Sequence, residues 1–406
     1  MNLLKSSLCS KNNINIFQKD KFRIEMAESI LDLEEAWSMA APEDIFFSIA
    51  FLKCVEQNPP SGIKPYYAVV FENENAVGIV YLQLKYVKLK ENLRADTLTS
   101  RKVVKKATYS FKKIVVEKIN FHTIICGNLM LTGKYGYHFN NEIPINDHFK
   151  LVQSVTDHLY NDLKTINISP GLVLIKDMFS KQLPDQISDF DFTSFSVQPK
   201  MILHLKKSWN SFDDYLNDMK SKYRVRARKA FQKSENIIKR EFDSDDINKY
   251  QGEIMTLYRN IADEAGFNAF ILHDNYFSAL KLSLGDNMKF ITYWKENKIV
   301  AFFTSIINYD VLDAHFLGYD QDENFNSQLY LNMLYDLVRE GIKQKVDHID
   351  MSRTAVEIKS TVGAVPHEMH LFLKHSNPVL NKIVKPILGF VKPNDKFVIR
   401  SPFRDE

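Results

Sequence analysis

The chain has 406 residues, of which 45% are hydrophobic and 25% are charged, and its formal net charge is +3. This length suits two or three globular domains, and the composition is ordinary for such domains. A net charge this small gives no reason to expect binding to DNA. The three cysteines, Cys9, Cys54 and Cys126, lie far apart, which argues against a disulfide framework or a metal motif and favours a reducing compartment.

The sequence contains no apolar run of the kind that a signal peptide or a membrane-spanning helix requires. We therefore expect a cytoplasmic protein. We expect no metal site either, because "HEMH" at residues 367–370 does not have the four-residue spacing of a zinc motif on a helix.

The first half of the chain predicts a β-hairpin followed by a strand, a helix and a strand. The hairpin is "PYYAVVFENENAVGIVYLQL" (65–84), in which a polar turn joins two segments rich in β-branched and aromatic residues. A strand, "HTIICG" (122–127), a helix at 148–165 and a second strand, "GLVLIKD" (171–177), follow it.

The second half repeats this order. A hairpin at 288–307 leads to the strand "DVLDAHFLGYD" (310–320), an amphipathic helix at 327–345 and the strand "VDHIDM" (346–351). A repeated order of hairpin, strand, helix and strand predicts an α/β fold with mixed sheets in two similar lobes. The alternative is one large sheet whose halves resemble each other by chance.

We place the division between the lobes at residues 195 and 196. The surrounding stretch, "LPDQISDFDFTSFSVQPKM" (183–201), contains two prolines and scattered acids, as is typical of a linker. The predicted domains are an N-terminal lobe, 1–195, and a C-terminal lobe, 196–406.

A strongly basic segment interrupts the first lobe. Residues 85–118 contain eleven lysines and arginines and three acids, and apolar residues within the segment lie at helical spacing. A basic amphipathic helix can lie on an anionic membrane, and the tail at 377–397 mixes apolar residues and lysines in a similar way. Peripheral contact with the inner membrane is therefore one interpretation, and an insertion packed on the lobe with its lysines in water is the other.

A basic helix opens the second lobe. Ser211 and Asp214 have the spacing of a capping box, and a helix after them places Leu216, Met219 and Tyr223 on its packed face. The remaining surface carries six cations, Lys220, Lys222, Arg224, Arg226, Arg228 and Lys229. Close like charges repel, and an anionic partner would relieve that repulsion. Because arginine can bind phosphate through two parallel hydrogen bonds, Arg224 and Arg228 are the best candidates, and a solvated face is the alternative.

Three stretches, taken in order, resemble the FemAB-like branch of the GNAT acyltransferase fold. They are "GNLMLTGKYGYHF" (127–139), "KSKYRVRARKAFQKSE" (220–235) and "RTAVEIKSTVGAVPHEMHLF" (353–372). The resemblance covers roughly residues 25–390 and implies two GNAT lobes in tandem. It also implies transfer of an acyl or aminoacyl group from a thioester donor to an amine, in cell-envelope or lipid biosynthesis.

The resemblance places Lys359 near the centre of acyl transfer. An ammonium group there would stabilise the tetrahedral oxyanion that forms when an amine attacks a thioester. Glu357 could hold this lysine or accept a proton from the amine, and Arg353 could bind a carboxylate or phosphate. Gly363 would let the backbone approach a ligand closely. We expect these residues in a loop after the strand at 346–351, and an ordinary turn with a surface ion pair is the alternative.

Two further candidates lie on the strand at 310–320. His315 could act as a general base, although a histidine on a strand is more often a structural core residue. Tyr319 is a candidate for substrate binding. It opens a stretch, "GYDQDENFNSQ" (318–328), at the place where GNAT enzymes hold the pyrophosphate of coenzyme A on a glycine-rich loop. Its three acids would repel a pyrophosphate, which leaves the donor open.

We expect no permanently bound cofactor, with acyl-CoA or an acyl carrier protein as the donor and a small-molecule or lipid-linked amine as the acceptor. The segment 243–287 is too short and irregular for the helical arm that tRNA-dependent relatives insert, so we do not expect tRNA as a partner. A non-catalytic binding module at a membrane surface is the second hypothesis.

Overall fold

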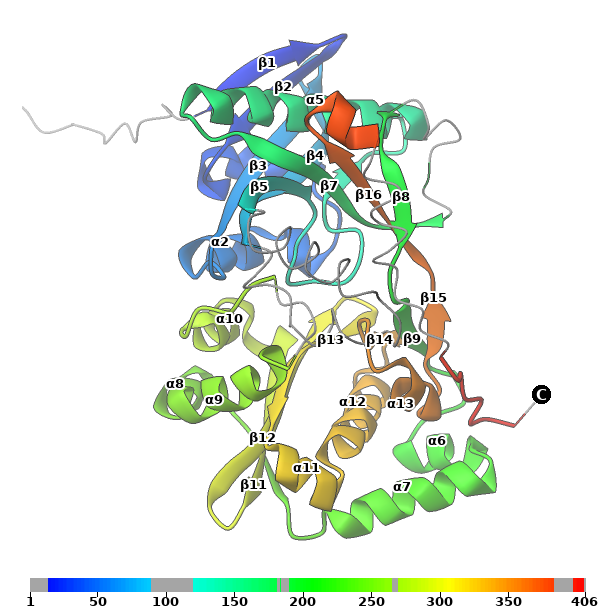
Figure 1. Cartoon of the computed structure of the whole chain (residues 1–406). Helices are drawn as coiled ribbons and strands as arrows, with labels where there is room; N and C mark the ends of the chain where they lie inside the picture. Colours follow the sequence, from blue (N-terminus) through cyan, green and yellow to red (C-terminus); the bar gives the residue numbers. More distant parts are fainter. Residues whose placement is uncertain are drawn as a thin grey trace, which may run out of the picture.

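The computed structural model describes residues 14–88, 120–180, 183, 190–264, 269–382 and 397–404. Two mixed sheets with flanking helices form two lobes, which lie one above the other in Figure 1. This arrangement confirms the predicted α/β fold with two lobes.

The first lobe is built on a sheet with the strand order β1-β2-β3-β4-β5-β7-β16-β8, in which β6 also pairs with β4. Its strands are β1 (Asn15–Lys19), β2 (Phe22–Ala27), β3 (Ile63–Glu72), β4 (Asn75–Lys88), β5 (Asn120–Cys126), β6 (Tyr137–Phe139), β7 (Pro170–Phe179), β8 (Thr193–Ser196) and β16 (Met369–His375). Helix α5 (Ile145–Thr165) packs its apolar stripe on one face of this sheet, and α1 (Glu34–Ala40) and α2 (Ile49–Gln57) pack on the other.

The second lobe has the strand order β10-β11-β12-β13-β14-β9-β15. Its strands are β9 (Lys200–His204), β10 (Ile238–Glu241), β11 (Met288–Lys295), β12 (Lys298–Asn308), β13 (Val311–Tyr319), β14 (His348–Asp350) and β15 (Val365–His367). Its helices are α6 (Phe212–Asp218), α7 (Ser221–Lys233), α8 (Ser244–Lys249), α9 (Gln251–Ala262), α10 (Tyr276–Leu284), α11 (Gln321–Ser327), α12 (Leu329–Gln344) and α13 (Val356–Thr361). Helices α6, α7, α12 and α13 contribute to the core on one face of this sheet, and α8, α9 and α10 pack on the other.

The repeated order of elements is present in both lobes. The hairpin β3–β4, strand β5, helix α5 and parallel strand β7 correspond to the hairpin β11–β12, strand β13, helix α12 and parallel strand β14. In each lobe the helix connects two parallel strands, as a crossover connection requires.

The chain crosses between the lobes at two neighbouring places. The predicted division at 195/196 falls within β8, which belongs to the first sheet, and the chain then enters the second sheet at β9. Residues 365–375 are divided between the two sheets, because β15 pairs with β9 and β16 pairs with β7. The C-terminal half therefore supplies a strand to the first sheet (Figure 1).

Two segments have a different secondary structure from the one that the sequence predicted. The basic helix is broken into α6 and α7, because Met219 has an extended backbone, is fully buried and forms a bridge with Phe403. The predicted capping box of Ser211 and Asp214 is present at the start of α6. The predicted loop after β14 contains a short helix, α13.

One apolar core extends across both lobes. It joins residues of the first lobe, such as Trp37 and Phe51, to residues of the second, such as Leu280 and Phe290. Within the described ranges, no helix has the length and apolar character needed to cross a membrane. Cys9, the basic segment beyond Lys88 and residues 383–396 of the basic tail lie outside the described residues.

Candidate functional site

Strands β13 and β14 separate at the junction between the lobes. They pair in parallel over three positions, the last of which joins Asp313 to Asp350, and the described residues form no β13–β14 pair beyond it. The following residues of β13, 314–317, are partly exposed although they belong to a central strand. A β-bulge lies at this place, where the Thr304 hydroxyl bonds both the N–H and the C=O of Phe316, at 2.8 and 3.0 Å. Bulges are frequent next to active sites, where they redirect a strand.

Two carboxyl groups and one ammonium group meet where the strands separate. Asp313 is 7% exposed and Asp350 is 3% exposed, and Lys200 of β9 forms an ion pair with Asp350. Burial, with the neighbouring charge of Asp350, raises the pKa of Asp313 well above its usual range. Oδ2 of Asp313 accepts no hydrogen bond from any donor in the described part of the chain. We infer that burial favours the protonated form of Asp313, while Asp350 is the partner of Lys200 in the ion pair.

Lys200 keeps its charge although it is buried. Burial acts to lower the pKa of its ammonium group, but the carboxyl groups of Asp350 and Asp313 outweigh burial and raise it. The cluster therefore contains one fixed ion pair and one carboxyl group that can exchange a proton.

The first lobe contributes Asp44 and Tyr135 to the same region. Asp44 accepts hydrogen bonds from the Phe46 N–H at 2.9 Å and from Asn308 of the second lobe at 3.1 Å, and burial raises the pKa of its carboxyl group. Burial also raises the pKa of the Tyr135 hydroxyl, with a further contribution from the nearby carboxyl groups of Asp313 and Asp44. The acidic groups of both lobes thus face one region.

His315 borders this region on β13. Its Nε2 shares a hydrogen bond of 2.7 Å with the Tyr276 hydroxyl, and its ring lies 6.4 Å from that of Phe46. Burial lowers the pKa of His315 to about 3, so its imidazole is neutral at pH 7. A role as general base would require Tyr276 to release Nε2.

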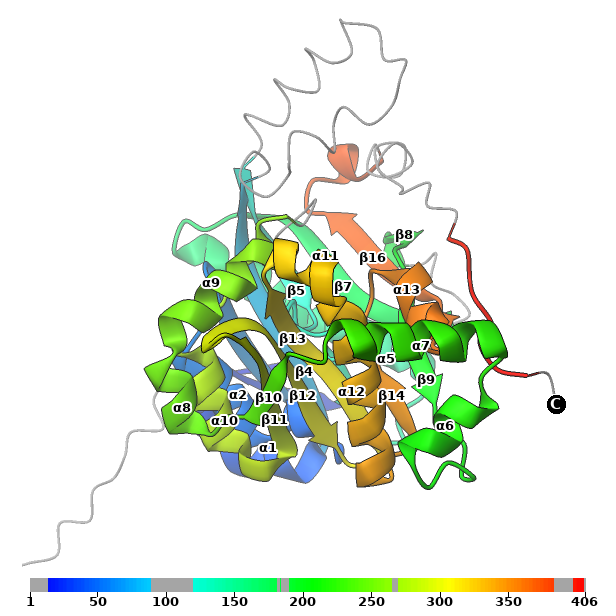
Figure 2. The same cartoon turned by 90° about the horizontal axis from the view of Figure 1, so that it is seen from below.

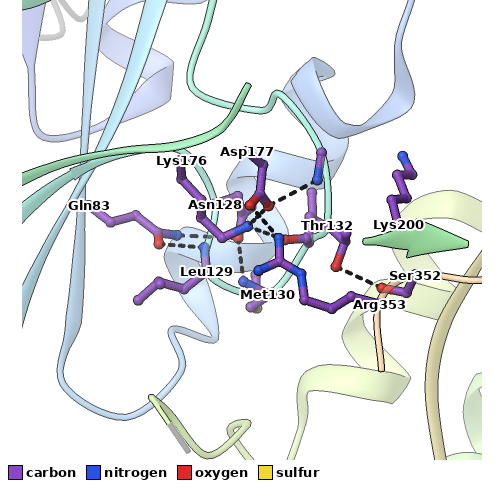
Figure 3. A network of polar contacts seen from close by, with 12 residues as sticks. Gln83, Asn128, Leu129, Met130, Thr132, Lys176, Asp177, Lys200, Ser352 and Arg353 are labelled. Carbon is purple, nitrogen blue, oxygen red and sulfur yellow. Dashed lines mark hydrogen bonds and ion pairs between the residues drawn. The ribbon is translucent and has the colours of Figure 1, made fainter. Parts of the chain in front are cut away.

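A buried ion-pair network crosses the lobe junction beside this cluster (Figure 3). Asp177 of β7 is fully buried and pairs with both Lys176 and Arg353, the latter from the second lobe. Burial alone would raise the pKa of Asp177, but these two cations outweigh it and lower the pKa. Burial lowers the pKa of Lys176 to about 8 although Asp177 acts in the opposite direction. Asp177 is therefore a charged buried group whose partners come from both lobes.

This network brings together two of the predicted segments, 127–139 and the segment that begins at Arg353. The backbone N–H of Gly133 donates to Asp177 at 3.1 Å, Lys176 donates to the carbonyl of Leu131 at 2.6 Å, and Ser352 donates to the Thr132 hydroxyl at 2.8 Å. The segment 127–139 therefore lies against the segment that contains Arg353 (Figure 3).

Buried amide side chains hold the beginning of the first segment. Gln83 of β4 accepts a hydrogen bond from the Leu129 N–H at 2.9 Å, and Asn128 accepts one from the Met130 N–H at 3.0 Å. These contacts satisfy backbone donors in an irregular, mostly buried segment.

Lys359 lies on α13 and is 5% exposed. Its ammonium group donates to the carbonyl of Arg353 at 2.7 Å, and burial, opposed by the charge of Asp350, lowers its pKa to about 7. Glu357, two residues earlier, is exposed and accepts a hydrogen bond from the Val398 N–H at 3.2 Å. The lysine is thus held by a backbone carbonyl and not by Glu357.

The other predicted binding residues lie away from the carboxyl cluster. Arg224 donates to the carbonyls of Asn217 and Met219, at 3.3 and 3.5 Å, and so binds the end of α6. Arg228 is exposed on α7, and Tyr319 lies at the end of β13, beside the ring of Tyr330.

The close approach at Gly363 is to another part of this chain, the C-terminal segment that contains Phe403. The φ of Gly363 is +101°, and a Cβ there would lie 2.3 Å from the ring of Phe403. The small residue therefore accommodates the C-terminal segment.

Sequence reasoning missed the acidic and basic residues at the centre of the site, namely Asp44, Tyr135, Lys176, Asp177, Lys200, Asp313 and Asp350. A signal was present, since Asp313, Asp350 and Asp177 each occur within an apolar strand segment. A charged residue at a position that the pattern marks as buried is a typical sign of a functional site.

The stretch at 318–328 forms helix α11 with Asp320 as its N-cap. Glu323 pairs with Lys295, and Asn324 accepts a hydrogen bond from the Tyr330 N–H at 2.9 Å. One donor at the beginning of α12, where a phosphate would be expected to bind, is therefore already occupied by the chain.

Comparison with solved structures identifies the fold. FemX superposes with a TM-score of 0.52 at 10% sequence identity, over 87% of this chain and 98% of FemX. A tandem GNAT protein from the clavulanic acid biosynthesis pathway has a TM-score of 0.48 at 9% identity, over 87% of this chain and 99% of its own. L-PGS from Bacillus licheniformis has a TM-score of 0.43 at 10% identity, over 83% of this chain and 95% of its own. No protein-family model and no curated protein matches the sequence.

The two lobes therefore form a tandem GNAT fold. More particularly, both lobes share the fold of FemX along nearly the whole of that chain.

Proposed function

We propose that this protein is an acyltransferase that moves an acyl or aminoacyl group from a thioester donor to an amine. The observation that carries the proposal is the buried carboxyl group of Asp313, beside the Lys200–Asp350 ion pair, where β13 and β14 separate. The fold shared with FemX supports it, and acyl-CoA or an acyl carrier protein would be the donor.

The proposed reaction begins when the neutral amine attacks the thioester carbonyl carbon and forms the new C–N bond. The carbonyl electron pair moves to oxygen, and the Lys359 ammonium stabilises this oxyanion. A protonated lysine has three donors, of which one is engaged with the carbonyl of Arg353, so two remain.

The intermediate then collapses and the C–S bond breaks. Asp313 gives its proton to the departing sulfur, and the Asp313–Asp350 pair takes a proton from the nitrogen, which restores its starting state. A carboxyl group whose pKa is raised toward the working pH suits this exchange.

The test measures thiol release from acyl-CoA and acyl carrier protein donors with a panel of amines. Asp313→Asn keeps the shape of the side chain and removes its proton exchange, so kcat should fall by about 10²- to 10⁴-fold. Asp310→Asn, the same change at an exposed position just before β13, is the matched control and should leave kcat unchanged.

Full activity of Asp313→Asn would refute the proposed role of the carboxyl pair. If no thioester donor releases thiol and none raises the thermal midpoint, the acyltransferase proposal fails. The alternative, a binding module without catalysis, is supported by the acidic helix α11 at the usual phosphate position. It predicts binding of a ligand without turnover.

A further inference from the structure

A small cavity lies between α7, α13 and the C-terminal segment, on the outer side of the second lobe. Its volume is about 220 Å³, and it is lined by Lys222, Tyr223, Arg226, Thr361 and Arg400. Figures 1 and 2 both show the C-terminal segment running beside α13 near α7, and the Arg400 N–H donates to Ser360 at 3.0 Å.

Three of the five lining residues are cations. Lys222 and Arg226 are four positions apart and so share one face of α7, and Arg400 comes from the opposite wall. Within the described ranges, none of the three forms an ion pair with a carboxylate. Glu357, an acid on α13, does not line the cavity and accepts the Val398 N–H. The cavity therefore concentrates positive charge that no carboxylate in the described part of the chain neutralises through an ion pair.

The size of the cavity limits its ligand. Pockets that enclose whole drug-sized ligands measure roughly 300–1,000 Å³. A cavity of about 220 Å³ suits one compact group. Two guanidinium groups and an ammonium group match a phosphate or diphosphate, because arginine can bind two phosphate oxygens with parallel hydrogen bonds.

We propose that this cavity binds the phosphate or diphosphate group of the acyl donor, an inference that rests on the proposed function. The beginning of α12 is a poor alternative, since acids of α11 precede it and Asn324 occupies one of its N–H groups. The cavity and the reaction centre share helix α13. Thr361 lines the cavity and Lys359 is two residues away, a rise of about 3 Å along the helix. The same short helix therefore borders both the cavity and the proposed reaction centre.

The test is isothermal titration of the full chain with inorganic pyrophosphate and, separately, with coenzyme A. Both should bind the wild type, and Arg226→Ala and Arg400→Ala should each weaken both by about tenfold or more, as expected for loss of a charge-assisted hydrogen bond. These side chains are exposed, so the variants should fold. Lys233→Ala, an equal charge removal on the same helix outside the cavity, should bind as the wild type does.

Failure of pyrophosphate to bind, or equal weakening by Lys233→Ala, would overturn the inference. Binding of pyrophosphate but not of coenzyme A would remove the assignment to the donor. Co-sedimentation with phosphatidylglycerol vesicles that depends on Arg226 and Arg400, without pyrophosphate binding, would assign the cavity to a membrane surface instead. Because binding is measured without turnover, a failure of acyl transfer is distinguishable from a failure of this inference.

Discussion

At the scale of single residues, the site shows how partners decide the charge of a buried group. Desolvation disfavours the charged form of every ionisable side chain. It shifts Asp313 toward its neutral acid and Lys359 toward its neutral amine. Lys200 and Asp177 are just as buried and remain charged, because each has an oppositely charged partner. The same environment thus supplies both fixed charges and groups that can exchange protons.

Lys359→Met tests whether the ammonium group stabilises the oxyanion. With a pKa of about 7, Lys359 is mostly charged at pH 6 and mostly neutral at pH 8.5. The variant should therefore lose about 10²- to 10³-fold in kcat at pH 6 and progressively less as the pH rises. The measurement is the ratio of wild-type to variant rates from pH 6 to 9, in which the ionisation of the amine substrate cancels.

Lys343→Met, the same change on the exposed surface of α12, serves as the control and should give a ratio near one throughout. If the ratio of the wild-type rate to the Lys359→Met rate does not change with pH, the proposed role of the ammonium group is contradicted.

At the scale of elements, α13 depends on the C-terminal segment packed beside it. Gly363 ends the turn after this helix with φ of +101° and lies against the ring of Phe403. Phe403 also bridges to Met219, at the break between α6 and α7. One contact surface therefore positions both helices that line the basic cavity.

Gly363→Ala should destabilise the protein by about 1–3 kcal/mol, because alanine is strained at this φ and its methyl group would overlap Phe403. Gly252→Ala is the matched substitution on α9, where nothing lies within 4 Å of the added methyl group. It should stabilise the protein by up to about 1 kcal/mol, since alanine is the better helix former. Urea unfolding of both variants measures the difference, and equal midpoints would contradict the packing argument.

At the scale of the whole molecule, the lobes are coupled by an apolar core and by a buried ion-pair network. The core contains side chains of both lobes, and strand β16 returns the chain to the first sheet. Asp177 joins the lobes through Arg353 while it also pairs with Lys176. We expect the lobes to unfold together.

Asp177→Asn tests this coupling. It leaves the buried Lys176 and the partly buried Arg353 without their counter-charge, which should cost about 3–5 kcal/mol of unfolding free energy. Glu28→Gln removes an exposed pair with Lys64 and should cost less than about 1 kcal/mol. Calorimetry should show one transition for the wild type and a lower midpoint for Asp177→Asn. An Asp177→Asn protein as stable as Glu28→Gln would show that the network does not hold the lobes together.

Much of the fold could be predicted because it depends on local pattern. The two hairpins and the helices α5 and α12 follow from apolar periodicity, and their repeated order indicated two lobes. The break after Asp218 could not be predicted this way, because the helical pattern continues through Met219 and only its bridge to Phe403 interrupts it. The division of 365–375 between two sheets was missed for the same reason, since pairing partners distant in sequence decide it.

For the site, the sequence by itself determined which residue types are available and on which elements they lie, including Lys359 and Arg353 after β14 and His315 on β13. Only the tertiary structure decided which of them meet. It joined Asp313 to Asp350 and Lys200 at the separation of two strands, and Asp177 to Arg353 across the lobes. The physical reason is that charge state depends on burial and on neighbours distant in the chain, and neither is encoded in the periodicity of a single segment.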